Sequence, residues 1–149
     1  MAKYLVTGGA GFIGSNIVKR LVELNEDVRV VDNLSTGKKE NIKPFLDKIE
    51  FIEGDFTNLD FARTVVKDVD FVLHQGAIPS VPRSIDNPLL TNNVNIQGTL
   101  NLLIASKDTG VKRFIYAASS SAYGDSPVMP KEESMNVSPK SPYAIQKLT

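Results

Sequence analysis

The 149-residue sequence contains no cysteine, one histidine (His74), and equal numbers of acidic and basic residues, so its formal net charge at pH 7 is zero. Without cysteine, the chain can form neither a disulfide bond nor a thiolate metal site, which fits a reducing compartment. One histidine cannot build a histidine metal cluster, and a hydrogen-bonded structural role is the more common one for such a residue. We therefore expect no metal site.

Acidic and basic residues are mixed along the chain rather than grouped by sign. This balance argues against nucleic acid or a membrane surface as a partner. The apolar run near the N-terminus is too short for a signal peptide or a membrane span. We expect a cytoplasmic protein, and the length suits one domain with a sizeable core.

Short apolar segments alternate with helical patterns along the whole chain. They are nearly continuous runs rich in Val, Ile and Phe, which is typical of strands buried on both faces. Strict alternation of strand and helix predicts an α/β fold, a Rossmann-type doubly wound parallel sheet with right-handed crossovers. The predicted strands are residues 3–7, 27–32, 49–54, 70–75 and 113–119.

Helices are predicted between these strands. One begins after Thr57, which with Asp60 three residues later resembles an N-terminal cap. A long helix spans 87–110 and ends at Gly110; its apolar stripe at helical spacing consists of Leu89, Ile96, Leu100 and Leu103. Ser141-Pro142 opens a last helix, with proline at its first position. The polar, proline-rich segment 124–142 before it is a long loop, and such loops are often functional.

Three glycines, Gly8, Gly11 and Gly14, lie where the first strand passes into the first helix. In a parallel sheet this turn can hold a pyrophosphate. The first glycine permits the tight turn, the second leaves room for the phosphates, and the third lets the helix pack close to the strand. The spacing Gly-x-x-Gly-x-x-Gly differs from the commonest fingerprint, and a bare turn would also explain glycines. Their position between a strand and a helix favours dinucleotide binding.

An acidic residue, Asp32, ends the second predicted strand. Its carboxylate can accept hydrogen bonds from both ribose hydroxyls of an adenosine and would repel a 2′-phosphate, and no arginine follows it directly. The residues therefore favour NAD over NADP as the cofactor. The alternative is that Asp32 is only a turn residue at the end of a strand.

Tyr143 and Lys147 are four residues apart on the last predicted helix and therefore share a face. An ammonium near the phenol favours the phenolate and would make Tyr143 a usable base. Ser119, Ser120 and Ser121 follow the fifth strand, at the sheet edge where ligands bind in open parallel sheets. Taken alone, the Tyr143–Lys147 pair could be an exposed amphipathic pair, and the serines could belong to a polar loop without a function. The combination of the two patterns indicates an active site.

These residues belong to a series of segments in which the sequence resembles the extended short-chain dehydrogenase/reductase family, in its nucleotide-sugar epimerase and dehydratase branch. The segments lie in family order, span the whole chain, and are most similar to those of UDP-N-acetylhexosamine 4-epimerases. They are TGGAGFIGS, VVDNLSTGKKENI, GD at 54–55, HQGAIPSVPRS, NNVNIQGTLNLL, AASSSAYGD and SPYAIQK.

The resemblance implies tightly bound NAD and assigns a set of cofactor contacts. They run from the glycine turn, through the ribose and adenine side, to the nicotinamide side. The set is Gly8, Gly11, Phe12, Ile13, Gly14, Asp32, Asn33, Ser35, Thr36, Gly37, Asp55, Phe56, Gln75, Gly76, Ala77, Ile78, Asn92, Tyr143 and Lys147.

The resemblance also implies inversion of C4 of a UDP-sugar by transient oxidation, with Tyr143 as base, Lys147 beside it, and Ser119 bridging the 4-hydroxyl. Ser120 and Ser121 would line the sugar site, and Ser80 would lie near the 2-substituent, after Pro79 where relatives often have glycine. Sugar 4,6-dehydratases carry Asp-Glu in place of Ser120-Ser121, and UDP-glucuronate decarboxylases carry glutamate in place of Ser121. The serines therefore favour epimerisation.

Members of this family are about twice as long and usually form homodimers. We therefore expect this chain to be the N-terminal half of a larger enzyme, truncated before the last strands and inactive by itself, because the substrate half is missing. The alternatives are a NAD-binding module without catalysis, a UDP-glucose 4-epimerase without acetamido activity, or a UDP-uronate epimerase. A regulatory nucleotide sensor with NADP preference is disfavoured by Asp32.

Overall fold

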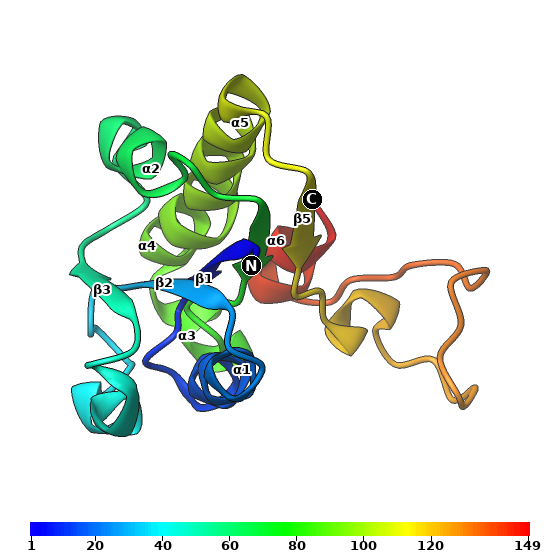
Figure 1. The fold of residues 1–149 in the computed structure, drawn as a ribbon. Helices are drawn as coiled ribbons and strands as arrows, with labels where there is room; N and C mark the ends of the chain where they lie inside the picture. Colours follow the sequence, from blue (N-terminus) through cyan, green and yellow to red (C-terminus); the bar gives the residue numbers. More distant parts are fainter.

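Five parallel strands form the centre of the computed structural model, which describes all 149 residues, and helices cover both faces of this sheet (Figure 1). The order across the sheet is β3-β2-β1-β4-β5, so the chain winds first to one side of β1 and then to the other. This is the predicted doubly wound α/β fold. The strands are β1 (Lys3–Thr7), β2 (Asp27–Asp32), β3 (Glu50–Glu53), β4 (Phe71–His74) and β5 (Arg113–Tyr116). Each lies within a predicted segment, and the last three are shorter than predicted.

Six α-helices and several short turns connect the strands. The helices are α1 (Phe12–Glu23), α2 (Leu59–Val65), α3 (Val81–Asp86), α4 (Pro88–Asn92), α5 (Thr99–Thr109) and α6 (Pro142–Leu148). A π-helical segment, Asn93–Gly98, joins α4 to α5, and 3-10 turns occur at Lys39–Asn41, Lys43–Phe45 and Ser120–Tyr123. The loop between the last of these turns and α6 extends away from the sheet beside β5 (Figure 1).

Side chains on β1 point alternately to the two faces, as they must in a strand. Leu5 packs with buried residues of α2 and α5 on one face, and Val6 packs with Val18 and Leu21 of α1 on the other. β1 pairs with β2 on one side and β4 on the other, so its backbone is fully enclosed. The core is therefore two apolar layers separated by the sheet, which explains why the strands are continuous apolar runs.

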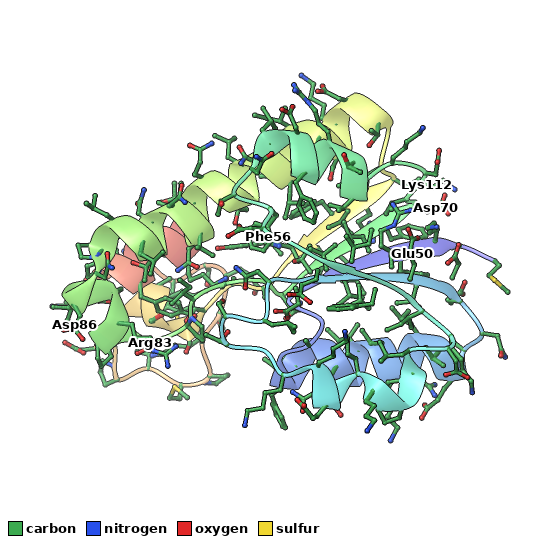
Figure 2. The ribbon with its side chains drawn as sticks, turned by 90° about the vertical axis from the view of Figure 1, so that its left-hand side faces the viewer. Glu50, Phe56, Asp70, Arg83, Asp86 and Lys112 are labelled. Carbon is green, nitrogen blue, oxygen red and sulfur yellow. The ribbon has the colours of Figure 1, made fainter.

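Ion pairs gather at the amino ends of the strands. Nε of Arg29 donates to Glu50 at 2.9 Å, and Lys112 pairs with Asp70 at 2.7 Å. Figure 2 shows Glu50, Asp70 and Lys112 at one end of the molecule, away from Arg83 and Asp86 at the other. The carboxyl ends of the strands carry a different set of polar residues, which forms the site described below.

The region predicted as one long helix is interrupted. Its C-terminal stop is as predicted, since Gly110 has φ of +75° and caps α5. The predicted apolar stripe, however, does not face the core: Leu89, Leu100 and Leu103 are exposed, and the buried positions include Asn95 and Leu102. The π-helical segment carries one extra residue in its turn, and this shifts the phase of the buried face.

The predicted cap of α2 is wrong by one residue. Asn58, not Thr57, precedes the helix, and its side-chain oxygen accepts a hydrogen bond from the backbone N–H of Phe61 at 2.9 Å. The other predicted cap is confirmed: Ser141 accepts from Ala144 N–H at 3.1 Å, directly before Pro142 in the first position of α6.

Candidate cofactor and active site

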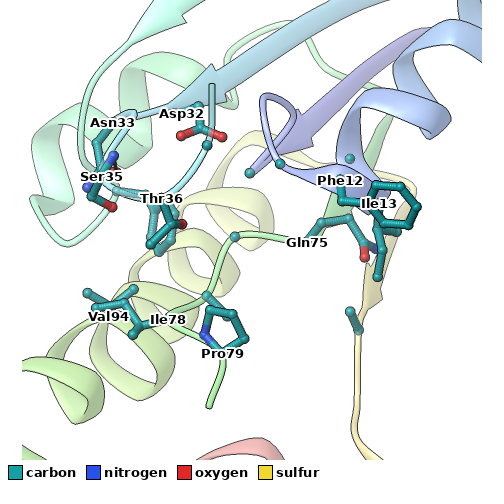
Figure 3. Close-up of a pocket in the computed structure, with 18 of the residues that line it drawn as sticks. Phe12, Ile13, Asp32, Asn33, Ser35, Thr36, Gln75, Ile78, Pro79 and Val94 are labelled. Atoms are coloured by element: carbon teal, nitrogen blue, oxygen red, sulfur yellow. Dashed lines mark hydrogen bonds between the residues drawn. The ribbon is translucent and has the colours of Figure 1, made fainter. Parts of the chain in front are cut away.

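A cavity of ≈ 540 Å³ opens where the strands end, at the carboxyl edge of the sheet. In Figure 3, Asp32, Ser35 and Thr36 lie on one side of it, and Phe12, Ile13 and Gln75 on another. All predicted cofactor-binding residues except Asn92 line it: Gly8, Gly11, Phe12, Ile13, Gly14, Asp32, Asn33, Ser35, Thr36, Gly37, Asp55, Phe56, Gln75, Gly76, Ala77, Ile78, Tyr143 and Lys147. Asn92 is exposed at the end of α4 and does not contact the cavity.

The glycine turn has the geometry that its spacing predicts. Gly8 has φ of +66°, a backbone conformation that side chains disfavour. A Cβ on Gly14 would lie 2.2 Å from the carbonyl oxygen of Gly8, so only glycine lets α1 start this close to β1. A Cβ on Gly11 would meet only the Gly8 oxygen, at 3.1 Å, and would otherwise project into free space.

The N-terminus of α1 is a suitable binding site for an anion. No side chain caps it, and its first turn contains no acidic residue. The first N–H groups of a helix have no partner within the helix, and the helix dipole adds a partial positive charge there. Because Phe12, Ile13 and Gly14 of this turn line the cavity, the turn fits a pyrophosphate.

The carboxylate of Asp32 connects the glycine turn to the loop after β2. One oxygen accepts from Ala10 N–H at 3.0 Å, and the other accepts from Leu34 N–H at 2.9 Å. A Cβ on Gly37 would lie 2.8 Å from the carboxylate, so this loop folds directly against it. Each carboxylate oxygen keeps a further lone pair that can accept from a ribose hydroxyl.

The helix α6 brings Tyr143 and Lys147 to the same cavity as the glycine turn, although they are far from it in sequence. The backbone N–H of Tyr143 donates to Ser84 Oγ of α3 at 3.0 Å, which fixes the start of the helix. Lys147 is buried, and this burial lowers its pKa to about 8. Its ammonium lies over the ring of Tyr116, 4.4 Å from the centroid. The predicted effect of this ammonium on the phenol of Tyr143 stays a prediction.

A buried amide network between α6 and the π-helical segment holds α6 in place. Asn95 Nδ2 donates to Gln146 Oε1 at 3.0 Å, and Gln146 Nε2 donates to Thr91 Oγ1 at 3.0 Å. Asn95 also bonds both backbone groups of Ile78, whose side chain lines the cavity. Sequence reasoning missed Asn95 and Gln146, because polar residues inside helical patterns look the same whether they face solvent or a partner.

His74 is hydrogen-bonded at both ring nitrogens, as expected for a structural histidine. The hydroxyl of Thr99 donates its hydrogen bond to the backbone carbonyl of Asn95, at 2.7 Å. Because that hydroxyl has no second proton, it accepts a hydrogen bond from His74 Nε2–H, at 2.9 Å. His74 Nδ1 therefore has no proton and accepts from Thr7 Oγ1 at 2.6 Å, which itself accepts from Gly76 N–H. Burial, with a smaller contribution from the Lys147 charge, lowers the pKa of His74 to about 3.

The serines predicted for the substrate lie apart from the main cavity. Ser119 and Ser120 line a second cavity of ≈ 590 Å³, which Lys147 also lines. Ser121 bonds Ser119, with their hydroxyl oxygens 2.6 Å apart. Ser80 caps α3 with φ of +117° and lines neither cavity. Lys147 and Ala118 line both cavities, and Lys147 is the charged residue between the predicted cofactor residues and the predicted substrate serines.

Five residues of the main cavity were not predicted as contacts: Pro79, Leu90, Val94, Ala117 and Ala118. Leu90 and Val94 are four residues apart in a helical stretch, and the two alanines directly follow β5. The sequence could have indicated both pairs of residues. Helical spacing places Leu90 and Val94 on one face, and the rule that ligands bind beyond strand ends applies to the two alanines.

A doubly wound parallel sheet with a glycine turn, an acidic residue at the end of the second strand and a cavity at the carboxyl edge defines a Rossmann-type dinucleotide-binding domain. No group of acidic or histidine side chains is placed to bind a metal ion, and none of the helices has the length and hydropathy needed to cross a membrane.

Residues 4–149 match the model of the NAD dependent epimerase/dehydratase family. The chain is 38% identical over 148 residues to the UDP-glucose 4-epimerase of Mycolicibacterium smegmatis, and the match covers 97% of this chain and 47% of that protein. The solved UDP-N-acetylglucosamine 4-epimerase from Methanobrevibacter ruminantium, in complex with UDP-N-acetylmuramic acid, is 43% identical with a TM-score of 0.92. The UDP-glucose 4-epimerase of Thermus thermophilus, solved in complex with NAD, is 39% identical with a TM-score of 0.90.

The chain belongs to the NAD dependent epimerase/dehydratase family. NAD is thus confirmed as the cofactor at the level of the family, in agreement with Asp32 and the open glycine turn. The two structural matches cover 99% and 97% of this chain but 47% of each solved structure, so the chain spans about half the length of such relatives.

Proposed function

We propose that this chain is the cofactor-binding and catalytic part of a nucleotide-sugar 4-epimerase that inverts C4 of a UDP-hexose or UDP-N-acetylhexosamine. One observation carries the proposal: Tyr143 and Lys147 enter the cavity that the glycine turn and Asp32 also line. Relatives named UDP-glucose 4-epimerase and UDP-N-acetylglucosamine 4-epimerase support the reaction class. The N-acetylhexosamine specificity is supported by the motifs IPSVPRS and SSSAYGD.

The main cavity fits NAD in its chemistry. The glycine turn would hold the pyrophosphate, and Asp32 would accept hydrogen bonds from the adenosine ribose, while Lys147 would donate to the nicotinamide ribose. When bound, NAD supplies a reversible hydride acceptor for the sugar C4.

The chain's own side chains handle the proton. Tyr143 Oη as phenolate accepts the proton of the sugar 4-hydroxyl, and returns it after C4 has been reduced from the opposite face. The Lys147 ammonium stabilises the phenolate, because both side chains reach the same cavity and an adjacent cation favours the anion. Ser119 would bridge the 4-hydroxyl from the second cavity, which Lys147 also lines.

Two further proposals concern the whole protein. We propose a homodimer, because α4, α5 and α6 expose large apolar side chains, among them Leu89, Leu100 and Ile145. The cytoplasmic location remains a prediction.

The test has two stages. Calorimetry with NAD first asks whether the 149-residue chain binds the cofactor, with Asp32→Asn as the matched control. The chain is then fused to the C-terminal half of the Mycolicibacterium smegmatis relative, and NAD binding and circular dichroism verify that the fusion folds. The anomeric protons of UDP-N-acetylglucosamine and of UDP-glucose are followed by NMR, with Tyr143→Phe as the inactive control.

Conversion of the acetylated sugar at a rate equal to or above that of UDP-glucose supports the full proposal. Conversion of UDP-glucose alone keeps the reaction and refutes the N-acetylhexosamine specificity. NAD binding with no conversion of either sugar contradicts the epimerase and supports the second candidate, a NAD-binding module. That candidate requires only the residues of the main cavity that are predicted to bind the cofactor.

A further inference from the structure

Lys147 carries a buried positive charge that has no carboxylate partner. The residue is 6% exposed, and none of the ion pairs in the structure includes it. Burying an ammonium without a counterion is strongly unfavourable, so some other group must offset part of this cost. The aromatic ring of Tyr116 is the group in contact with this ammonium.

The aromatic ring of Tyr116 lies against this ammonium, with Nζ of Lys147 at 4.4 Å from the ring centroid. This distance is well within the range of a cation–π contact, in which the negative face of the ring attracts the cation. Such a contact is stronger when the cation is desolvated, as it is here.

The ring of Tyr116 is itself held from two directions. It stacks on the imidazole of His74, with ring centroids 5.8 Å apart and planes at 27°. Its hydroxyl donates to the carbonyl of Gln146 at 3.4 Å, on the helix that carries Lys147. Tyr116 therefore links β5 to α6 beside the point where the two cavities meet.

We propose that Tyr116 is a positioning residue, whose ring face holds the Lys147 ammonium at the junction of the cofactor and substrate cavities. The catalytic meaning of this role rests on the proposed function. A carboxylate in the same place would neutralise the ammonium and compete for its hydrogen bonds, whereas an aromatic ring attracts the charge and takes none of its three N–H donors in a fixed direction. The cation is thus kept in place and remains free to bind ribose hydroxyls and a phenolate.

The other titratable groups near Lys147 are few. Tyr143 lies one turn before it on α6, and His74, on β4, is neutral because burial lowers its pKa to about 3. Four further titratable residues line the second cavity with Lys147: Tyr123, Lys131, Glu132 and Glu133. Neither glutamate forms an ion pair with Lys147. Burial lowers the pKa of Lys147 to about 8, so its titration falls in an accessible pH range.

The test is an NMR titration of the Lys147 side-chain Cε signal in the 149-residue chain, with the signal assigned from its loss in Lys147→Arg. In Tyr116→Leu the pKa of Lys147 is expected to fall by about one pH unit, since a desolvated cation–π contact is lost. In Tyr116→Phe, which keeps the ring, the pKa should stay within a few tenths of wild type. Lys39, whose ammonium lies 5.4 Å from the ring centroid of Phe51, is an internal control and should not change.

An isosteric series keeps the test decisive if Tyr116→Leu fails to fold. Phenylalanine with one, two, three and five fluorine atoms at position 116 retains the shape of the ring and progressively removes the negative charge of its face. The pKa of Lys147 should fall stepwise along this series. An unchanged or raised pKa, in the series or in Tyr116→Leu, overturns the proposal.

Calorimetry with NAD separates this inference from the proposed function. A lowered Lys147 pKa together with NAD binding weakened about tenfold in Tyr116→Leu supports both. A lowered pKa with NAD binding unchanged supports the contact between Tyr116 and Lys147, and refutes its role in cofactor binding. Loss of NAD binding in Tyr116→Phe as large as in Tyr116→Leu assigns the effect to the hydroxyl and overturns the role of the ring.

Discussion

Mild acid is expected to destabilise this fold through a single residue, His74. In the folded chain, burial lowers the pKa of His74 to about 3, compared with an ordinary value of 6.5. Both ring nitrogens are engaged, and Nδ1 accepts the Thr7 proton, so a proton on Nδ1 would break that bond and bury a charge. The unfolded chain has no such restriction and takes up the proton near pH 6.5.

The direction and size of the effect follow from proton linkage. Because the pKa of His74 is lower in the folded state, its contribution is fully present above pH 6.5 and is lost as the pH falls toward 3. Each pH unit within this window costs about 1.4 kcal/mol in the free energy of unfolding. Between pH 6.5 and 5 the expected loss is about 2 kcal/mol, and over the whole window it approaches about 5 kcal/mol.

Urea unfolding at fixed pH values from about 7 to about 5, followed by circular dichroism, measures this loss. The chain has one histidine and ordinary carboxyl groups titrate below this range, so the slope reports His74 almost alone. The control is His74→Gln, which should be less stable than wild type at neutral pH but nearly independent of pH in this interval. A wild-type free energy of unfolding that stays constant over this interval, or a His74 ring signal that titrates near its ordinary pKa by NMR, would refute the reasoning.

Four substitutions, one of them a control, test other parts of the structure. Gly14→Ala should lower the free energy of unfolding by about 3 kcal/mol in urea titrations and weaken NAD binding, because the added methyl would lie 2.2 Å from the Gly8 oxygen. Its control is Gly110→Ala, where φ of +75° strains the backbone but the added methyl meets no other atom. This control should cost about 1 kcal/mol and leave NAD binding intact. Asp32→Asn should weaken NAD binding about tenfold by calorimetry while NADP binding is unchanged or tighter, and equal weakening of both would contradict its ribose role. Gln146→Leu should cost about 2 kcal/mol, since it removes one hydrogen bond from each of the buried residues Asn95 and Thr91; a loss below about 0.5 kcal/mol in thermal unfolding would argue against the network.

The features that local chemistry controls were predictable from the sequence. The positive φ of Gly8, the close contact at Gly14 and the left-handed stop at Gly110 each depend on a few neighbouring atoms, and glycine is the residue that allows them. The same holds for the cap of α6, where Ser141 and Pro142 act within one turn. The place of the cap of α2 was wrong by one residue, because Thr57 and Asn58 are both good capping residues and the surrounding packing selects between them.

The long helix shows the limit of local patterns. A regular helical period predicts one buried apolar stripe, but the π-helical segment changes the phase, and Leu89 and Leu100 are exposed while Asn95 is buried. A polar residue can be buried there only because Gln146 and Ile78 supply its hydrogen bonds. Because these partners lie far from Asn95 in the sequence, the residues around Asn95 do not predict that it is buried and hydrogen-bonded.

The sequence by itself determined the alternation of buried strands and helices, the glycine turn, the acidic residue at the end of β2, and the Tyr143–Lys147 pair on one helix. All of these follow from short-range spacing and from the burial of apolar runs. The tertiary structure alone decided that Lys147 lies over Tyr116 between two cavities, that Asn95 and Gln146 hold α6, and that His74 is neutral. Those properties depend on desolvation and on contacts between segments far apart in the chain, which exist only once the sheet has brought the segments together.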